Sequence, residues 1–219
     1  MFNTSVIYLC IMLLIIGYLC GNLHGAFIIG KLFKKQDIRD FGSGNSGSTN
    51  ALRVFGFRLA LPAFIIDFVK GFLPVFFVCV ISDLLLKLIG CSMIYTGETI
   101  AMLKTMIAFG IILGHNYPFV LKFKGGKGIA SSVGILMGIN WLVGFIFGSL
   151  ILIISFATKY VSLGSCISSL LLPFIMYFIT WDKNYIILSV FLAVFALYRH
   201  KSNIVRLKNG TENKFGKKK

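Results

Sequence analysis

The sequence predicts an all-α fold: a polytopic bundle of about seven transmembrane helices, with the N-terminus outside the cell and the C-terminus inside. Its 219 residues are 57% hydrophobic and only 13% charged, with a mean hydropathy of +0.88. A soluble domain of this length needs more polar surface than that. The apolar residues fall in long runs, and about 20 helical residues cross the ~30 Å hydrocarbon core of a bilayer. We therefore expect one integral membrane domain over residues 1–219, with a short basic tail from about residue 199.

Seven apolar segments are predicted to be the spans. The run 129–159 is too long for one helix, so we divide it at residues 138–141 into a short fourth span and a full fifth. The other spans cover about residues 5–29, 59–82, 99–113, 161–180 and 185–198. A count of five or six is also possible, because several of these segments are short.

The placement of lysine and arginine supports an odd number of spans. The loops after the first, third and fifth spans and the tail lie on one side, and they hold most of the cations: Lys31, Lys34, Lys35, Arg39, Arg53, Arg58, Lys122, Lys124, Lys127, Lys159, Arg199, Lys201, Arg206, Lys208, Lys214, Lys217, Lys218 and Lys219. The opposite loops hold only Lys87 and Lys183. Because positive residues mark the cytoplasmic side, we expect these loops and the tail to be inside.

The net charge of +15 does not by itself indicate a function. Much of it is explained by topology, and the last three lysines are expected to lie near anionic lipid headgroups. Nucleic-acid binding is not expected, since the chain has no soluble domain to carry it. The three histidines are scattered and the cysteines form no CxxC pair, so no metal site and no cofactor are predicted.

The first inside loop contains the segment GSGNSGSTN at residues 42–50, followed by Arg53. Glycines alternating with small polar residues let a backbone curl and point its N–H groups into one concavity, which binds anions. Hydroxyl groups and a following arginine add directional donors. A flexible linker is the alternative, as Gly/Ser-rich segments often are, but the asparagines and the arginine favour a site.

The second inside loop reads GHNYP at residues 114–118 and FKGGKG at residues 123–128, immediately before a predicted span. Cationic side chains next to a helix N-terminus favour phosphate. This is not a Walker A loop, because the GxxxxGK[ST] spacing is missing. The alternative is that the lysines only mark the cytoplasmic end of a span. That explanation does not require the glycines between them.

Three other features are weaker. The loop around Ser162 and Ser165 resembles ordinary helix packing in membranes. His200 and Asn203 share one helix face if the last helix continues, although a lone histidine at a helix end is usually interfacial. Asp67 and Lys70 lie three residues apart within the second span, where such groups are either functional or neutralise one another.

The segments at residues 42–53, 114–128, 162–165 and 199–212 together resemble the acyl-phosphate:glycerol-3-phosphate acyltransferase family of the PlsY type, in order and over almost the whole chain. The resemblance implies a bacterial inner-membrane enzyme with its active site facing the cytoplasm. Such an enzyme moves a fatty acyl group from acyl phosphate to the 1-hydroxyl of sn-glycerol 3-phosphate, giving lysophosphatidate and phosphate. It also implies functional coupling to the enzyme that makes acyl phosphate.

The resemblance implies the site residues as well. As catalytic residues it implies Ser43, Asn45, Arg53, Lys127, His200 and Asn203. As substrate-binding and phosphate-binding residues it implies Gly44, Gly47, Thr49, Asn50, His115, Lys124, Gly125, Gly126, Gly128, Ser162 and Ser165.

This chain departs from the family pattern at three places. Asn22-Leu23-His24 stands where Ser-Ile-Pro is usual, Ser46 where proline or isoleucine is common, and Ser48 where alanine is usual.

Two other classes of protein are alternatives to this family. The soluble-headed acyltransferases use a His-x4-Asp motif, and none of the three histidines here has an aspartate five residues later, which excludes that class. A transporter for an anionic solute is the main alternative, because Asp67 and Lys70 lie at membrane depth. Against it, the motifs gather on one face and the two halves show no inverted repeat.

Overall fold

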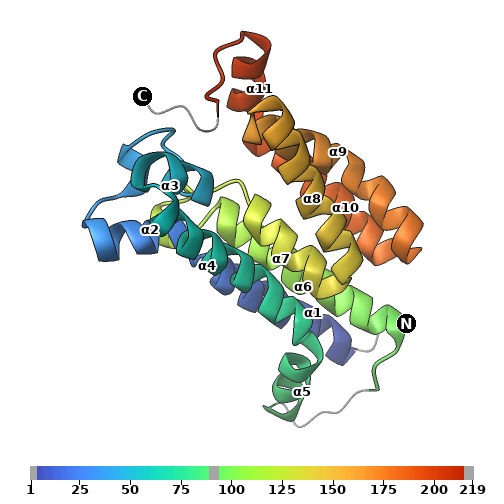
Figure 1. Ribbon diagram of the computed structural model, residues 1–219. Coiled ribbons are helices and arrows are strands. Elements are labelled where there is room, and N and C mark those ends of the chain that lie inside the picture. Colours follow the sequence, from blue (N-terminus) through green and yellow to red (C-terminus); the bar gives the residue numbers. More distant parts are fainter. Residues whose placement is uncertain (1–3, 89–93, 215–219) are drawn as a thin grey trace.

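The computed structural model describes residues 4–88 and 94–214, and within these ranges it contains helices and loops but no strand (Figure 1). A π-helical turn (Gly30–Lys34) follows α2, and 3-10 turns (Ile38–Asp40 and Phe119–Leu121) precede α3 and α7. The α-helices are α1 (Thr4–Gly21), α2 (Gly25–Ile29), α3 (Ser48–Phe55), α4 (Phe57–Phe76), α5 (Val78–Leu88), α6 (Gly97–Asn116), α7 (Ile129–Ile139), α8 (Trp141–Thr158), α9 (Val161–Thr180), α10 (Lys183–Arg199) and α11 (Lys201–Lys208).

Five stretches of the described chain are long and apolar enough to cross a membrane, and a sixth is added if α10 and α11 count as one span bent by 59°. The five are Thr4–Lys34, Phe57–Phe76, Gly97–Leu121, Trp141–Thr158 and Val161–Thr180. Helix α7 has 11 residues, which at 1.5 Å per residue is about 17 Å and well short of the hydrocarbon thickness. The all-helical membrane fold is confirmed, while the count of seven spans stays a prediction.

The predicted span boundaries are partly right. Residue Asn140 separates α7 from α8, and its Oδ1 accepts hydrogen bonds from the N–H groups of Leu142 (3.0 Å) and Val143 (3.3 Å). This N-cap confirms the division at residues 138–141. The first predicted span is interrupted, because α1 stops at Gly21 and the chain turns before α2, but it lies within the apolar stretch Thr4–Lys34. The second was wrong at its end, because α4 ends at Phe76 and α5 is a separate helix.

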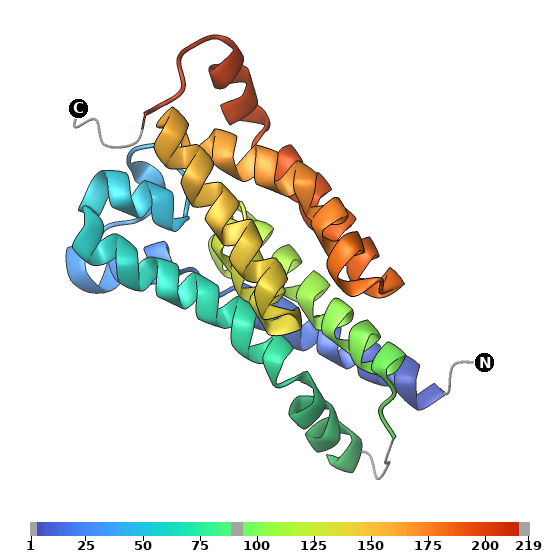
Figure 2. The ribbon, with the colours of Figure 1, turned by 45° about the vertical axis from the view of Figure 1, so that its right-hand side comes forward.

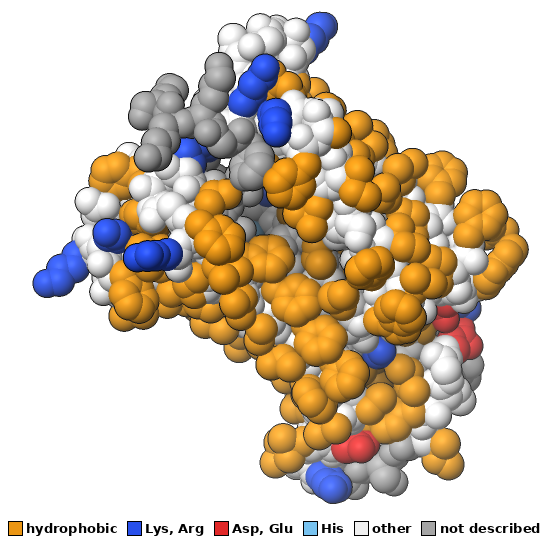
Figure 3. Space-filling view, in the orientation of Figure 1, with side chains coloured by type: hydrophobic (Ala, Val, Ile, Leu, Met, Phe, Trp, Pro, Cys, Tyr) orange, Lys and Arg blue, Asp and Glu red, His pale blue; other side chains and the backbone are white. Residues whose placement is uncertain are grey.

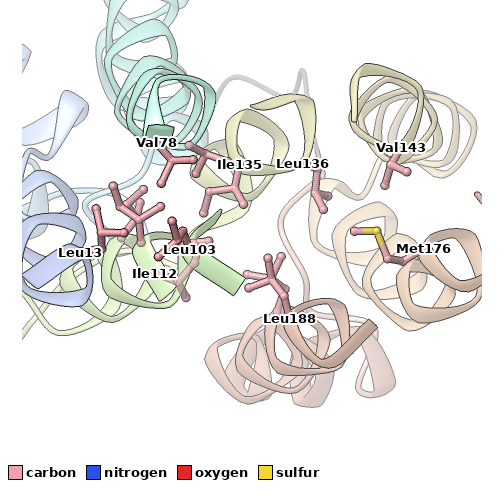
Figure 4. Close-up of a cluster of buried hydrophobic side chains, with 14 of the residues drawn as sticks. Leu13, Val78, Leu103, Ile112, Ile135, Leu136, Val143, Met176 and Leu188 are labelled. Atoms are coloured by element: carbon pink, nitrogen blue, oxygen red, sulfur yellow. The ribbon is translucent and has the colours of Figure 1, made fainter. Parts of the chain in front are cut away.

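The helices pack in two groups (Figures 1 and 2). In the first group α1 lies along α6 and α4 lies along α7; in the second, α9 contacts both α8 and α10. The two groups meet where α10 contacts α6 and α8 contacts α7. Figure 4 shows the buried core that joins them, which includes Leu13 of α1, Ile135 of α7, Met176 of α9 and Leu188 of α10.

Helices α1 and α6 approach closely because glycines face each other across the contact. A Cβ on Gly17 would lie 2.2 Å from the carbonyl oxygen of Ile107, and one on Gly110 would lie 2.2 Å from that of Leu14. Small residues let membrane helices pack backbone to backbone, since burial against lipid supplies no hydrophobic force between them.

We expect Gly17→Ala to destabilise the protein by about 1–3 kcal/mol, the usual cost of overpacking, because its methyl group collides with α6 backbone. The matched control is Gly148→Ala in α8, where the new Cβ would meet Val133 Cγ1 at an ordinary 3.6 Å. Removing that glycine also favours the helix by about 1 kcal/mol. Thermal unfolding in detergent should therefore separate the two variants, and equal melting temperatures would contradict the packing argument.

The surface is divided by polarity. Most of the long helices are covered by hydrophobic side chains, as lipid exposure requires (Figure 3). Lysine and arginine gather at the end of the bundle where α2, α3 and α11 lie, and the acidic side chains visible in this view are toward the other end. The three loops with candidate site residues all belong to the cationic end.

Candidate active site

A pocket of about 300 Å³ opens at the cationic end of the bundle. It joins three parts of the chain that are far apart in sequence: the first loop (residues 42–50), the second loop (residues 114–128) and the junction of α10 with α11. We call it the cationic pocket, and it is lined by Ser43, Asn45, Tyr117, Lys127, Tyr198, Arg199, Lys201, Ser202, Asn203 and Arg206. The lining contains four cations and no carboxylate, which suits an anionic ligand.

The first loop is folded around Asn50, which is buried with 2% exposure. Its Oδ1 accepts a hydrogen bond from the N–H of Ser43 (2.8 Å), and its Nδ2 donates to carbonyl oxygens of Ile38 (3.1 Å), Phe41 (3.0 Å) and Asn45 (3.0 Å). Gly42 and Gly44 adopt positive φ in the turn (+63° and +70°). The side chain of Asn50 therefore shapes the loop that presents Ser43 and Asn45, and it does not line the pocket.

Helix α3 begins directly after this loop, at Ser48 and Thr49. Its N-cap residue, Gly47, offers no side-chain cap, so first-turn N–H groups and the positive end of the helix are left at the loop. Arg53 lies one turn later. Its side chain is exposed, and it forms no ion pair or hydrogen bond with the described part of the chain.

The second loop is fastened between two helix ends. The N–H of Gly126 donates to the carbonyl oxygen of His115 in α6 (3.0 Å). From α10, Arg199 donates to the carbonyl oxygens of Gly126 (3.1 Å) and Gly125 (2.9 Å), and its guanidinium lies over the ring of Tyr117, 5.4 Å from the centroid. This clamp leaves Lys127 at the edge of the pocket.

The two glycines of this loop have no room for a side chain. A Cβ on Gly125 would lie 2.1 Å from the carbonyl oxygen of His115, and a Cβ on Gly126 would lie 2.1 Å from the Nε2 of the same histidine. Their role is close packing on α6. Gly128 has a φ of +82° just before α7, a backbone conformation that favours glycine at this position.

Lys127 is connected to a buried carboxylate through Asn203. The Nζ of Lys127 donates to the Oδ1 of Asn203. The Nδ2 of Asn203 in turn donates to the Oε1 of Glu212 (2.7 Å). Glu212 also accepts hydrogen bonds from Ser162 (2.9 Å) and from Arg206 Nε (2.7 Å). Burial raises the pKa of the Glu212 carboxyl, but the hydrogen bonds from Asn203, Arg206 and Ser162 outweigh it and hold this pKa below its usual value. The charged glutamate thus joins α9, α11 and the tail.

Several predicted residues lie away from the pocket lining. His115 is 2% exposed and its Nδ1 lies 2.8 Å from Lys70 Nζ; Ser165 donates to the carbonyl of Val161 within its own helix (2.9 Å). His200 is 3% exposed, and its Nδ1 lies 2.7 Å from the carbonyl of Ala196. That contact assigns the proton to Nδ1 and leaves Nε2 as an acceptor.

Some pocket residues were not predicted. The predictions omit Tyr117, Tyr198, Arg199, Lys201, Ser202, Arg206 and, behind the pocket, Glu212. All of them except Tyr198 lie within the segments 114–128 and 199–212 that carry the family resemblance. Glu212 carried one usable signal, since it is the only acidic residue after Asp182.

The sequence model of the family described as Glycerol-3-phosphate acyltransferase matches residues 11–210. The chain belongs to this family. The curated glycerol-3-phosphate acyltransferase of Thermoanaerobacter pseudethanolicus is 42% identical over 205 residues (93% of this chain and 94% of the relative). That of Clostridioides difficile is 36% identical over 213 residues (97% and 98%).

Solved structures of the family have the same fold. The integral membrane glycerol 3-phosphate acyltransferase PlsY (YgiH), in its glycerol 3-phosphate form, has a TM-score of 0.82 and 30% identity, covering 94% of this chain and 96% of that one. Its lysophosphatidic acid form has a TM-score of 0.80 and 29% identity, covering 94% and 95%. This chain is therefore an integral membrane enzyme of the glycerol-3-phosphate acyltransferase family.

Proposed function

We propose that this chain transfers a fatty acyl group from acyl phosphate to the 1-hydroxyl of sn-glycerol 3-phosphate. The products are 1-acyl-glycerol 3-phosphate and inorganic phosphate. This reaction is the first step of phospholipid synthesis. The observation that carries the proposal is the cationic pocket, which joins both glycine-rich loops to Asn203 and Arg206 and has no carboxylate in its lining. Both substrates carry phosphate, and the pocket lies at the ends of helices whose apolar surface suits an acyl chain.

The reaction asks for positioning and charge stabilisation. The 1-hydroxyl oxygen attacks the acyl carbonyl carbon, the bond from that carbon to the phosphate oxygen breaks, and the phosphate leaves with the electron pair. The departing phosphate takes the hydroxyl proton. Holding hydroxyl and carbonyl in contact supplies much of the rate, and Lys127 stabilises negative charge that develops on the leaving phosphate.

The proposal includes roles for individual residues, supported for some of them by their place in the pocket lining. We assign phosphate binding to Lys127, Ser43 and the first turn of α3 at Thr49, with Arg53 swinging in from its exposed position. Asn45 and Asn203, both in the pocket lining, are assigned to the glycerol hydroxyls or the acyl carbonyl. An arginine suits a two-pronged phosphate contact and a lysine a point charge.

We place the pocket at the cytoplasmic face, with the N-terminus outside, the C-terminus inside and seven membrane-crossing segments in one domain. The basic loops and tail support this orientation through the positive-inside rule. A cytoplasmic pocket would receive glycerol 3-phosphate directly, and acyl phosphate from the enzyme that makes it.

The transporter alternative receives no support from the buried ion pair. Lys70 Nζ lies 2.9 Å from Asp67 Oδ1, and both side chains are at most 2% exposed. Lys70 also donates to the carbonyl oxygens of Gly21 (3.1 Å) and Leu23. The pair is fully occupied in joining α1 to α4, which is a structural role.

A direct acyl-transfer assay tests the proposal. The purified protein would receive labelled glycerol 3-phosphate with either palmitoyl phosphate or palmitoyl-CoA. Lysophosphatidate formed from the phosphate donor alone is the expected result. Product from the CoA donor alone would overturn the donor assignment, and no product from either would overturn the proposed function.

We expect kcat/KM for glycerol 3-phosphate to fall as pH rises through about 8. Burial, with the nearby charges of Arg206 and Arg199, lowers the pKa of Lys127 to about 8 even though Glu212 acts in the other direction. In the free enzyme the ammonium is present below that pH and is lost above it, so phosphate binding weakens on the alkaline side. The control is Lys127→Arg, which stays charged and should lack this inflection in a pH profile of kcat/KM. An unchanged inflection in that variant would assign it to another group.

A further inference from the structure

His24 is buried between two parts of the bundle without belonging to the cationic pocket. It stands at the N-cap of α2, in the turn after α1, with 1% exposure. Its ring lies against the ring of His115 at the end of α6, with centroids 4.8 Å apart and planes 32° apart. Nothing in the proposed reaction uses this side chain, yet a buried imidazole needs polar partners.

The partner of His24 is the middle of the first loop. Ser46 is completely buried, and its Oγ lies 3.1 Å from His24 Nδ1. Ser46 follows Asn45, which lines the pocket, and precedes Gly47, the N-cap of α3. This hydrogen bond therefore fixes the loop at the point between its pocket-lining residue and the helix that carries Thr49 and Arg53.

His115, the second of these two rings, also contacts the second loop. Its carbonyl oxygen accepts the N–H of Gly126, and its ring is the surface on which Gly126 packs. Its Nδ1 is held by Lys70, which is itself paired with Asp67. The adjacent rings of His24 and His115 are thus a buried bridge from one glycine-rich loop to the other.

We propose that His24 is a positioning residue that, through Ser46 and the ring of His115, sets the separation of the two glycine-rich loops and so the affinity for glycerol 3-phosphate. The proposal rests on the proposed function for its substrate, but its geometry is independent of it.

A double-mutant cycle tests the bridge. The variants His24→Leu and Ser46→Ala each remove one partner of the His24–Ser46 hydrogen bond. The variant His24→Asn keeps a hydrogen-bonding group near the position of the His24 Nδ1. We expect each of the first two to raise KM for glycerol 3-phosphate about tenfold, the usual effect of leaving one buried hydrogen-bonding group without its partner. We expect kcat to change less than KM, because neither His24 nor Ser46 is assigned a contact with the reacting atoms.

The combined variant H24L/S46A should be no worse than either single variant, and His24→Asn should restore most of the affinity. Additive effects, or a Ser46→Ala variant with unchanged KM, would overturn the proposal. The matched control is Ser189→Ala, which removes an equally buried hydroxyl that donates within α10 (2.7 Å to Ile186) and should leave KM unchanged.

Hydrogen exchange supplies a readout that needs no turnover. Amides of residues 42–50 should exchange faster in His24→Leu and Ser46→Ala than in the parent protein, while amides of α9 should not change. Unchanged exchange in the loop would overturn the bridge even if KM rose. If the parent protein transfers no acyl group, the proposed function fails, and the exchange result still decides whether His24 positions the loop.

Discussion

Replacing Lys127 by alanine is expected to lower kcat/KM for acyl transfer by about a thousandfold, the upper range for removing one preorganised electrostatic contact. The pocket has other cations, but Lys127 alone is carried by the clamped glycine loop and bonded to Asn203. The others come from α10 and α11. The loss should therefore fall on kcat as well as on KM, because a stabiliser of the leaving phosphate acts mainly in the transition state.

The protein should remain folded in this variant. Burial lowers the pKa of Lys127, which means that the charged form is held at a cost. Removing the charge therefore leaves the melting temperature unchanged or slightly higher, and steady-state assays can be paired with thermal unfolding of the same sample. The control is Lys208→Ala at the exposed end of α11, which should keep full activity. A Lys127→Ala variant with near-normal turnover would remove this residue from the site.

Sequence reasoning went furthest where the local pattern alone determines structure. The polar Asn140 within an apolar run is a capping residue, and it ends one helix and starts the next as expected. The same reasoning placed the residue types of both loops and of the tail on one face, and the structure brings Ser43, Asn45, Lys127 and Asn203 to one pocket. Ser43, Asn45 and Lys127 lie in loops and Asn203 in α11, and all four have polar side chains that apolar packing does not require.

It reached less far where a residue's surroundings depend on what packs against it. The anion-binding role of Gly125 and Gly126 stays a prediction, and the structure adds a packing reason for both glycines, because His115 occupies the space of each missing Cβ. Asn50 was expected to meet substrate, yet all of its polar atoms are spent on folding the loop. Arg199 donates to Gly126, 73 residues away, and Glu212 accepts from Ser162, 50 residues away, which are separations that no local pattern encodes.

The second large effect is expected from the buried ion pair. Lys70→Met should destabilise the protein by about 3–5 kcal/mol, the range for breaking a buried pair from one side. The reason is the carboxylate that remains. Asp67 would keep only the N–H of Gly25 (3.2 Å) among its present donors, in a place that water does not reach. The turn between α1 and α2 would also lose the ammonium that holds two of its carbonyl groups.

A second lysine within the bundle provides the comparison. Lys104 of α6 donates to the carbonyl oxygen of Gly138 (2.9 Å) and has no carboxylate partner among the described residues. Lys104→Met therefore leaves no orphaned charge, and its melting temperature should stay much closer to that of the parent protein. The double variant D67N/K70M should recover part of the loss, because it removes both charges together. If Lys70→Met and Lys104→Met were equally destabilising, the cost would come from lost lysine packing, and the pair could no longer be regarded as the electrostatic link between α1 and α4.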